Sequence, residues 1–87
     1  MEITAAVIRE QGVEFVVVLV TRQATQPGSR EATARSVQPL FPGRPMVLCS
    51  QDWQGTPTYF GRRDLVQFLA NVFMEQLPWK KYRSVAA

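Results

Sequence analysis

Histidine is absent from this sequence of 87 residues, and cysteine occurs once, at position 49. Without histidine, the chain lacks the side chain that most often serves as a general base and as a metal ligand. A single cysteine also excludes an internal disulfide and a zinc site of the closed Cys/His kind. We therefore expect neither a metal nor another cofactor, and we interpret Cys49, within MVLCS, as a small apolar residue of a strand.

Paired carboxylates and glycine-rich phosphate loops are lacking as well. The seven acidic residues are scattered along the chain, and the five glycines match neither the phosphate-loop nor the dinucleotide-binding pattern. Acidic residues that are distant in the sequence can still converge in space. Because an active site normally needs such groups, we nevertheless expect a protein that is not an enzyme.

Long hydrophobic runs are also missing. The longest, residues 15–20, is far too short to cross a bilayer. The first ten residues carry neither the basic segment nor the long apolar segment of a secretory signal. Together with the single cysteine, these absences predict a soluble, cytoplasmic protein that has no membrane partner.

The apolar residues that are present suffice for one small core. Apolar residues make up 46% of the sequence and charged residues 20%, which is typical of globular proteins. We expect residues 1–87 to form a single small α+β domain. The net charge of +3 and the isoelectric point of about 9.6 permit binding to a polyanion but do not require it.

Alternating β-branched residues predict two N-terminal strands, residues 2–9 and 13–20, joined by a reversal at Gly12. The second strand is apolar on both faces, so each of its faces needs a cover. A second copy of the chain, in a homodimer, is the simplest cover for the face that is left open. The alternative is that the C-terminal tail folds across it.

The remaining sequence predicts a helix, a second hairpin, a second helix and a tail. Prolines and glycines delimit these elements. The predicted elements are a helix over 30–38 capped by Ser29 and ended by Pro39, strands over 46–51 and 56–61, a turn over 52–55, and a helix over 62–76. Pro57 places its strand at a sheet edge. The prediction is a two-layer sandwich, in which both helices cover one face of an antiparallel sheet of about four strands, followed by a short extended tail.

Arg62 and Arg63 begin the second predicted helix, where positive charge opposes the helix dipole. This arrangement is typical of a site for a phosphate or a carboxylate. The alternative, which we favour, is that Asp64 neutralises the turn and that both arginines are merely solvated.

Two tryptophans are further candidates. Trp53 lies in the turn over 52–55, either as an exposed contact residue or packed back on its own hairpin. Trp79 belongs to the tail, where Lys80, Lys81 and Arg83 follow it. Neither face of this tail is purely basic or purely aromatic, so we favour packing of Trp79 against the helix or the sheet edge, with the lysines pointing outward.

These observations predict a non-enzymatic binding or adaptor domain that forms a homodimer or binds another protein. The less favoured alternative is a nucleic-acid-binding module with basic residues on phosphates and a tryptophan on bases. Its contact residues would be Arg62, Arg63, Lys80, Lys81, Arg83, Trp53 and Trp79. A third reading is a ligand-binding or catalytic anion site at 61–64.

Overall fold

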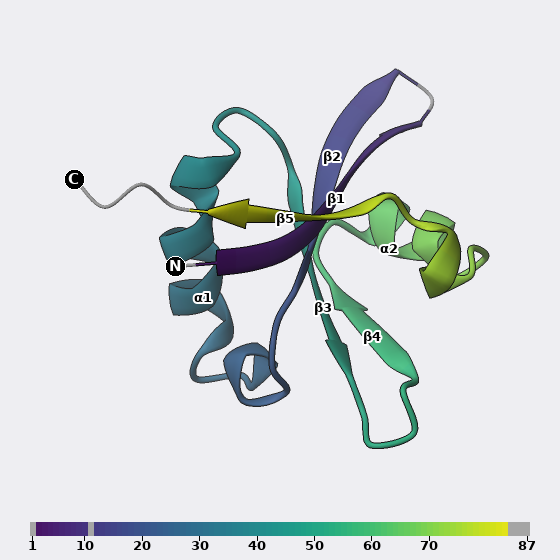
Figure 1. Ribbon diagram of the computed structural model, residues 1–87. Helices are drawn as coiled ribbons and strands as arrows, with labels where there is room; N and C mark the ends of the chain where they lie inside the picture. Colours follow the sequence, from purple (N-terminus) through teal and green to yellow (C-terminus); the bar gives the residue numbers. More distant parts are fainter. Residues whose placement is uncertain (1, 11, 84–87) are drawn as a thin grey trace.

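The computed structural model describes residues 2–10 and 12–83. A five-stranded sheet in the order β4-β3-β2-β1-β5 lies at its centre (Figure 1). Its strands are β1 (Glu2–Glu10), β2 (Val13–Leu19), β3 (Met46–Gln51), β4 (Pro57–Phe60) and β5 (Trp79–Arg83). The helices are α1 (Arg30–Val37) and α2 (Arg63–Leu69), with short 3₁₀ helices η1 (Gln23–Thr25), η2 (Gln38–Leu40) and η3 (Met74–Gln76). The predicted α+β class is confirmed.

The sheet is mixed, because β2 and β3 run parallel while the other three neighbouring pairs are antiparallel. Between β2 and β3 the chain passes through η1, α1 and η2, and such a crossover brings β3 back in the direction of β2. The prediction of an antiparallel sheet of about four strands is therefore wrong in the number of strands and in one pairing. The tail, predicted as merely extended, pairs with β1 as a fifth strand.

Strand β2 separates two apolar clusters, one on each face of the sheet. Its odd-numbered residues pack with α2, and its even-numbered residues pack with the end of α1. The buried members on the α2 side include Phe15, Val17, Leu65 and Leu69, and those on the α1 side include Val16, Val18, Val37 and Phe41. The two helices lie on opposite faces (Figure 1), so the predicted two-layer arrangement is wrong.

The chain itself covers both faces of β2. Residues 15–18 are fully buried, at 0% exposure, without any second copy. A strand that is apolar on both faces requires a cover on each, and here the two helices provide it. The homodimer thereby loses the observation that motivated it, although its existence is not tested by this packing.

Within the predicted helix 62–76, only Arg63–Leu69 is α-helical, and Met74–Gln76 forms the separate 3₁₀ helix η3. α2 ends at Leu69, and the side-chain amide of Asn71 donates to the carbonyl oxygen of Gln67 at 3.1 Å, which satisfies one carbonyl of the last turn. Beyond η3, Leu77 is buried and Trp79 begins β5. A continuous helix could not bring Leu77 into the core and Trp79 into the sheet, so tertiary packing overrides the local pattern.

The turn residues follow the sequence prediction more closely. Gly12 and Gly55 adopt positive φ angles of 78° and 85°, as tight reversals require. Ser29 precedes α1 as predicted, but its side chain forms no capping hydrogen bond. Gln11 and Ser84 lie outside the described residues. Within the described ranges, no helix has the length and apolar character needed to span a membrane.

Candidate binding site at the free edge of strand β4

The structure separates the two basic groups that the nucleic-acid hypothesis combines. Arg62 and Arg63 follow β4 at one edge of the sheet, whereas Lys80, Lys81 and Arg83 lie on β5 at the other edge. Strands are spaced by ~4.8 Å, so the two edge strands are roughly 19 Å apart. The two groups therefore form no single compact site within one chain.

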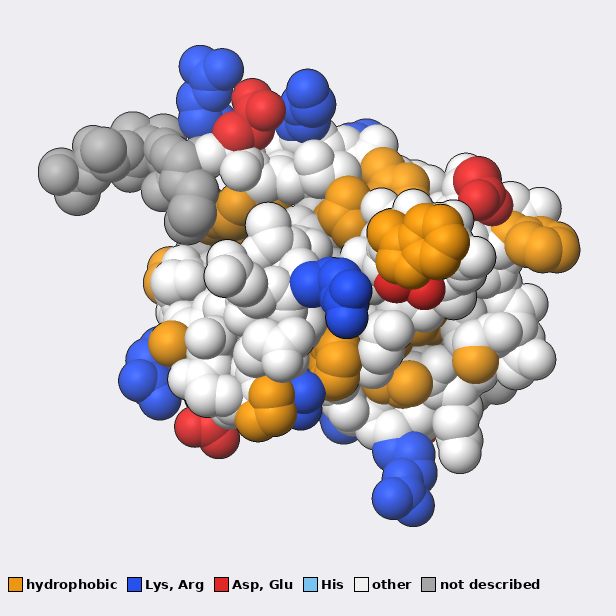
Figure 2. Space-filling model, turned by 90° about the horizontal axis from the view of Figure 1, so that it is seen from below, with side chains coloured by type: hydrophobic (Ala, Val, Ile, Leu, Met, Phe, Trp, Pro, Cys, Tyr) orange, Lys and Arg blue, Asp and Glu red, His pale blue; other side chains and the backbone are white. Residues whose placement is uncertain are grey.

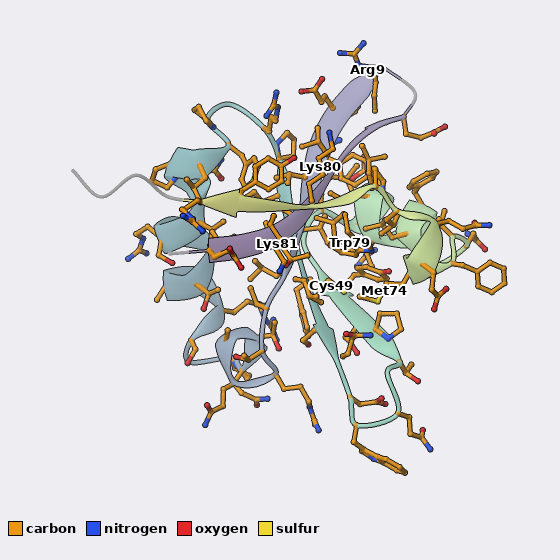
Figure 3. The ribbon with its side chains drawn as sticks, viewed as in Figure 1. Arg9, Cys49, Met74, Trp79, Lys80 and Lys81 are labelled. Carbon is orange, nitrogen blue, oxygen red and sulfur yellow. The ribbon has the colours of Figure 1, made fainter. Side chains whose placement is uncertain are left out.

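Trp79 belongs to the core rather than to an open aromatic platform. Its indole Nε1 donates to the carbonyl oxygen of Met74 at 2.8 Å, and its ring packs against the cluster on the α2 side (Figure 3). Lys80 and Lys81 leave β5 on opposite faces, and Lys81 lies 3.8 Å from a carboxylate oxygen of Glu2. The tail thus packs, as the sequence analysis favoured.

Arg62 is neutralised locally. Its guanidinium donates two hydrogen bonds to Asp64, from Nε at 3.0 Å and from Nη2 at 2.7 Å. This pairing lowers the pKa of the Asp64 carboxyl and raises the pKa of Arg62. The favoured interpretation of Asp64 as the neutralising residue is therefore correct for Arg62.

Arg63 does not share this pairing and instead lines a cavity together with Arg30, the first residue of α1. The two arginines line one cavity of about 340 Å³ at the end of β4, here called the arginine hollow. Its lining residues are Arg30, Tyr59, Phe60, Gly61, Arg63 and Val66. Neither arginine forms an ion pair with any residue in the ranges 2–10 and 12–83.

Arg30 is not among the site residues predicted from the sequence, because only the fold brings the start of α1 to β4. The Arg30 guanidinium carbon lies 4.0 Å from the centroid of the Phe60 ring, a cation–π contact. Its Nε also donates to the carbonyl oxygen of Thr25 at 3.0 Å. These two contacts hold the side chain of Arg30 over β4 and leave its terminal nitrogens available for an anion.

Gly61 allows the chain to turn closely past β3 from β4 into α2. A β-carbon at this position would lie 3.0 Å from the carbonyl oxygen of Met46 and 3.0 Å from a methyl group of Val47. The bare backbone of Gly61 therefore brings Arg63 back to the end of β4. Gly61 also lines the arginine hollow, so the close approach of its backbone to β3 fixes one wall of this cavity.

Trp53 is exposed at 86%, in the turn between β3 and β4. The carboxylate of Asp52 accepts hydrogen bonds from the backbone N–H groups of Gln54 and Thr56, both at 2.9 Å, and so fixes this turn. The alternative in which Trp53 packs back on its hairpin is thus excluded. On the face toward which this turn points, hydrophobic side chains are interspersed with Lys and Arg side chains (Figure 2).

Two potentially reactive groups, the thiol of Cys49 and the hydroxyl of Tyr59, are buried on the α2 side of the sheet. Burial raises the pKa of the Cys49 thiol to about 11, so the reactive thiolate is scarce at neutral pH. The hydroxyl of the neighbouring Tyr59 is buried and finds no hydrogen-bond partner among the described residues. Burial also raises the pKa of this phenol, with smaller contributions from Cys49 and Glu75. Neither group has the environment of an activated nucleophile.

A larger cavity of about 430 Å³ lies on the other side of α2, next to the hairpin of β1 and β2. Its walls combine apolar side chains with carboxylates and amides. Its lining residues are Glu10, Val13, Phe15, Asp64, Leu65, Gln67, Phe68 and Asn71. Asp64 is already paired with Arg62, whereas no carboxylate among the described residues pairs with Arg30 or Arg63. The arginine hollow is therefore the stronger candidate site.

No protein-family model, no curated protein and no solved structure matches this chain.

Proposed function

We propose that this chain is a non-enzymatic adaptor domain that binds another protein through the arginine hollow and the adjacent free edge of β4. The observation that carries the proposal is the pair Arg30 and Arg63, which face one cavity without a carboxylate partner among the described residues. Guanidinium groups recognise carboxylates through directed, paired hydrogen bonds. The expected partner therefore presents acidic residues, with Trp53 as an additional contact beyond the hollow.

The inert character of the buried groups supports a binding role over a catalytic one. The pKa of the Cys49 thiol is raised, and its side chain is fully buried in the core. A single cysteine that serves as a core residue also suits a reducing compartment, so the proposal includes a cytoplasmic location.

Self-association as a homodimer is a second form of the same proposal. The exposed side chains of Trp53 and Phe73, at 86% and 73%, favour some association. Each copy carries a net charge of +3, however, and this charge opposes the association of two copies through the arginine hollow. An acidic partner is therefore the favoured occupant.

The nucleic-acid reading depends on different residues. Lys80, Lys81 and Arg83 all lie exposed on the edge strand β5, and in this reading they would contact phosphates. Trp79 is half-buried beside them and offers little free ring for stacking. Nucleic-acid binding is therefore the less favoured function, and the experiment below tests it together with binding of an acidic partner.

The test is binding of an acidic peptide to single-residue variants. We expect a capped hexaglutamate peptide to shift the amide resonances around 58–66 of the isotopically labelled protein. Arg30→Ala and Arg63→Ala should each weaken the affinity about threefold, the scale of an exposed ion pair, and the double variant about tenfold. The measurement is a nuclear magnetic resonance titration at low salt.

The charge-matched control is the double variant Arg22→Ala, Arg35→Ala, which removes two exposed arginines that line neither cavity. It should bind like the wild type. Equal losses in both double variants would show unspecific charge attraction and would overturn the proposal. Tighter binding of a DNA duplex, lost on changing Lys80 and Lys81 to alanine, would favour the nucleic-acid reading, and a dimer in light scattering of the free protein would favour self-association.

A further inference from the structure

We infer that the partner enters the site as an additional β-strand along β4, and that it carries two adjacent acidic residues, one for Arg30 and the next for Arg63. This inference rests on the proposed function and specifies how its partner is recognised. It has three supports: the direction of the free backbone groups of β4, the placement of the two arginines on opposite faces of the sheet, and the charge of the hollow.

The hydrogen bonds of β3 determine which backbone groups of β4 are free. Val16 and Val20 of the β2 side donate to the carbonyl oxygens of Pro45 and Cys49, so odd-numbered residues of β3 face β2. The even-numbered residues of β3 therefore face β4, where their register partners are Thr58 and Phe60.

The intervening residues of β4, Pro57 and Tyr59, consequently direct their backbone groups away from the sheet. Tyr59 offers both an N–H and a C=O to an added strand, while Pro57 offers a C=O alone. This edge is the last strand of the sheet, and no strand of the described chain pairs with its outer side. Peptides that add a strand to a sheet use such edges.

The two arginines approach this edge from opposite faces. Arg30 begins α1 and lies over Phe60, which packs with the cluster on the α1 side. Arg63 begins α2, and its neighbours Tyr59 and Val66 pack with the cluster on the α2 side. Both side chains reach the same hollow, so they flank β4 at one level along the strand.

The side chains of consecutive residues in a strand point to opposite faces. In a strand added beside β4, one residue therefore points toward Arg30 and the next toward Arg63. Two glutamates in adjacent positions can satisfy both arginines, whereas two glutamates separated by one residue lie on the same face and can reach one arginine alone. The fold thus predicts a sequence preference in the partner, independent of its total charge.

The length of the recognised segment is limited. β4 has four residues, and Pro57 removes one donor, features that also protect the edge from indiscriminate pairing. The other edge of the sheet, β5, carries Lys80 and Lys81, and edge lysines protect in the same way. From these constraints we expect the partner to pair with β4 through a short acidic segment and to bind with modest affinity.

The experiment compares capped hexapeptides of identical composition. The adjacent peptide is Thr-Val-Glu-Glu-Val-Thr, and the alternate peptide is Thr-Glu-Val-Glu-Val-Thr. We expect the adjacent peptide to bind about threefold more tightly, the contribution of one additional exposed ion pair. The backbone N–H of Tyr59 should shift downfield on binding, and methylation of the peptide's backbone nitrogens should abolish the binding.

Arg63→Ala and Arg30→Ala should each erase the preference between the two peptides, while the Arg22→Ala, Arg35→Ala control keeps it. Equal binding of the adjacent, alternate and methylated peptides, with losses in the variants of the hollow, would overturn strand addition but leave the proposed acidic partner intact. Absence of any dependence on Arg30 and Arg63 would overturn both. A glutamine version of the adjacent peptide that binds as tightly would also overturn the charge requirement.

Discussion

At the scale of single residues, the hydroxyl of Tyr59 is the least expected feature of the core. It is buried without a hydrogen-bond partner among the described residues, and a polar group in that position typically costs about 1–3 kcal/mol of stability. The ring of the same residue packs against the cluster on the α2 side, and its backbone faces the free edge. Tyr59 therefore combines a ring that packs in the core with a hydroxyl that lowers the stability of the fold.

Removing the hydroxyl of Tyr59 should not lower the stability of the protein. We expect Tyr59→Phe to leave the free energy of unfolding unchanged or to raise it by up to about 1 kcal/mol, because the unsatisfied group disappears while the ring remains. Chemical denaturation monitored by circular dichroism measures the effect. Tyr82→Phe, on the other face of the sheet, serves as the control. A loss of more than about 1 kcal/mol in Tyr59→Phe would mean that the hydroxyl has a partner after all.

At the scale of elements, the connection from β4 to α2 decides where the arginine hollow forms. Four residues of edge strand are followed at once by a close passage over β3 and then by a helix of seven residues. The helix is short because the chain must bring Leu77 into the core on the α2 side and Trp79 into the sheet. These constraints leave Arg63 at the cavity and pair its neighbour Arg62 with Asp64.

A substitution at Gly61 tests whether the connection from β4 to α2 passes this close to β3. We expect Gly61→Ala to lower the free energy of unfolding by about 1–3 kcal/mol, because the new methyl group overlaps the backbone of β3. Gly28→Ala is the matched control, since no atom lies within 4 Å of the β-carbon it would add. Thermal denaturation of both variants gives the comparison, and similar stabilities for the two would refute the close approach at Gly61.

At the scale of the whole molecule, a charged group joins the first hairpin to the approach to β3. Glu14 of β2 accepts hydrogen bonds from Arg9 of β1 and from Arg44, which precedes β3. These two bonds are the main reason that the pKa of the Glu14 carboxyl lies below its usual value of 4.5. A carboxyl group with a lowered pKa in the folded state stabilises the fold while it is ionised.

The contribution of Glu14 should therefore be complete above pH 4.5 and disappear as the pH falls through the lowered pKa of the folded state. We expect the stability of the wild type to fall with acidification more steeply than that of Glu14→Gln, until the two curves converge. Arg44→Gln should reproduce part of the change in slope. Urea denaturation over a pH series measures this, and parallel curves for wild type and Glu14→Gln would contradict it.

Most elements could be predicted from the sequence because their signals are local. Alternation of apolar residues marked β1 and β2, Gly12 and Gly55 marked reversals, and Pro57 marked an edge strand. The helix predicted over 62–76 was too long, because periodicity alone does not show that Leu77 is needed in the core and Trp79 in the sheet. Arg63 was among the candidate site residues, whereas Arg30 left no local signal.

The sequence by itself thus determined the α+β class, the positions of the turns and the scarcity of groups for acid–base chemistry, all of which depend on composition and on neighbours along the chain. Only the tertiary structure decided that β2 and β3 run parallel, that the helices cover opposite faces of the sheet and that β5 pairs with β1 as an edge strand. It also decided that Arg30 and Arg63 meet at β4. The physical reason is that burial and ion-pair geometry depend on residues far apart in the chain. Several segments, or a second copy of the chain, could have covered the two apolar faces of β2, and the tertiary structure places α2 on one face and the end of α1 on the other.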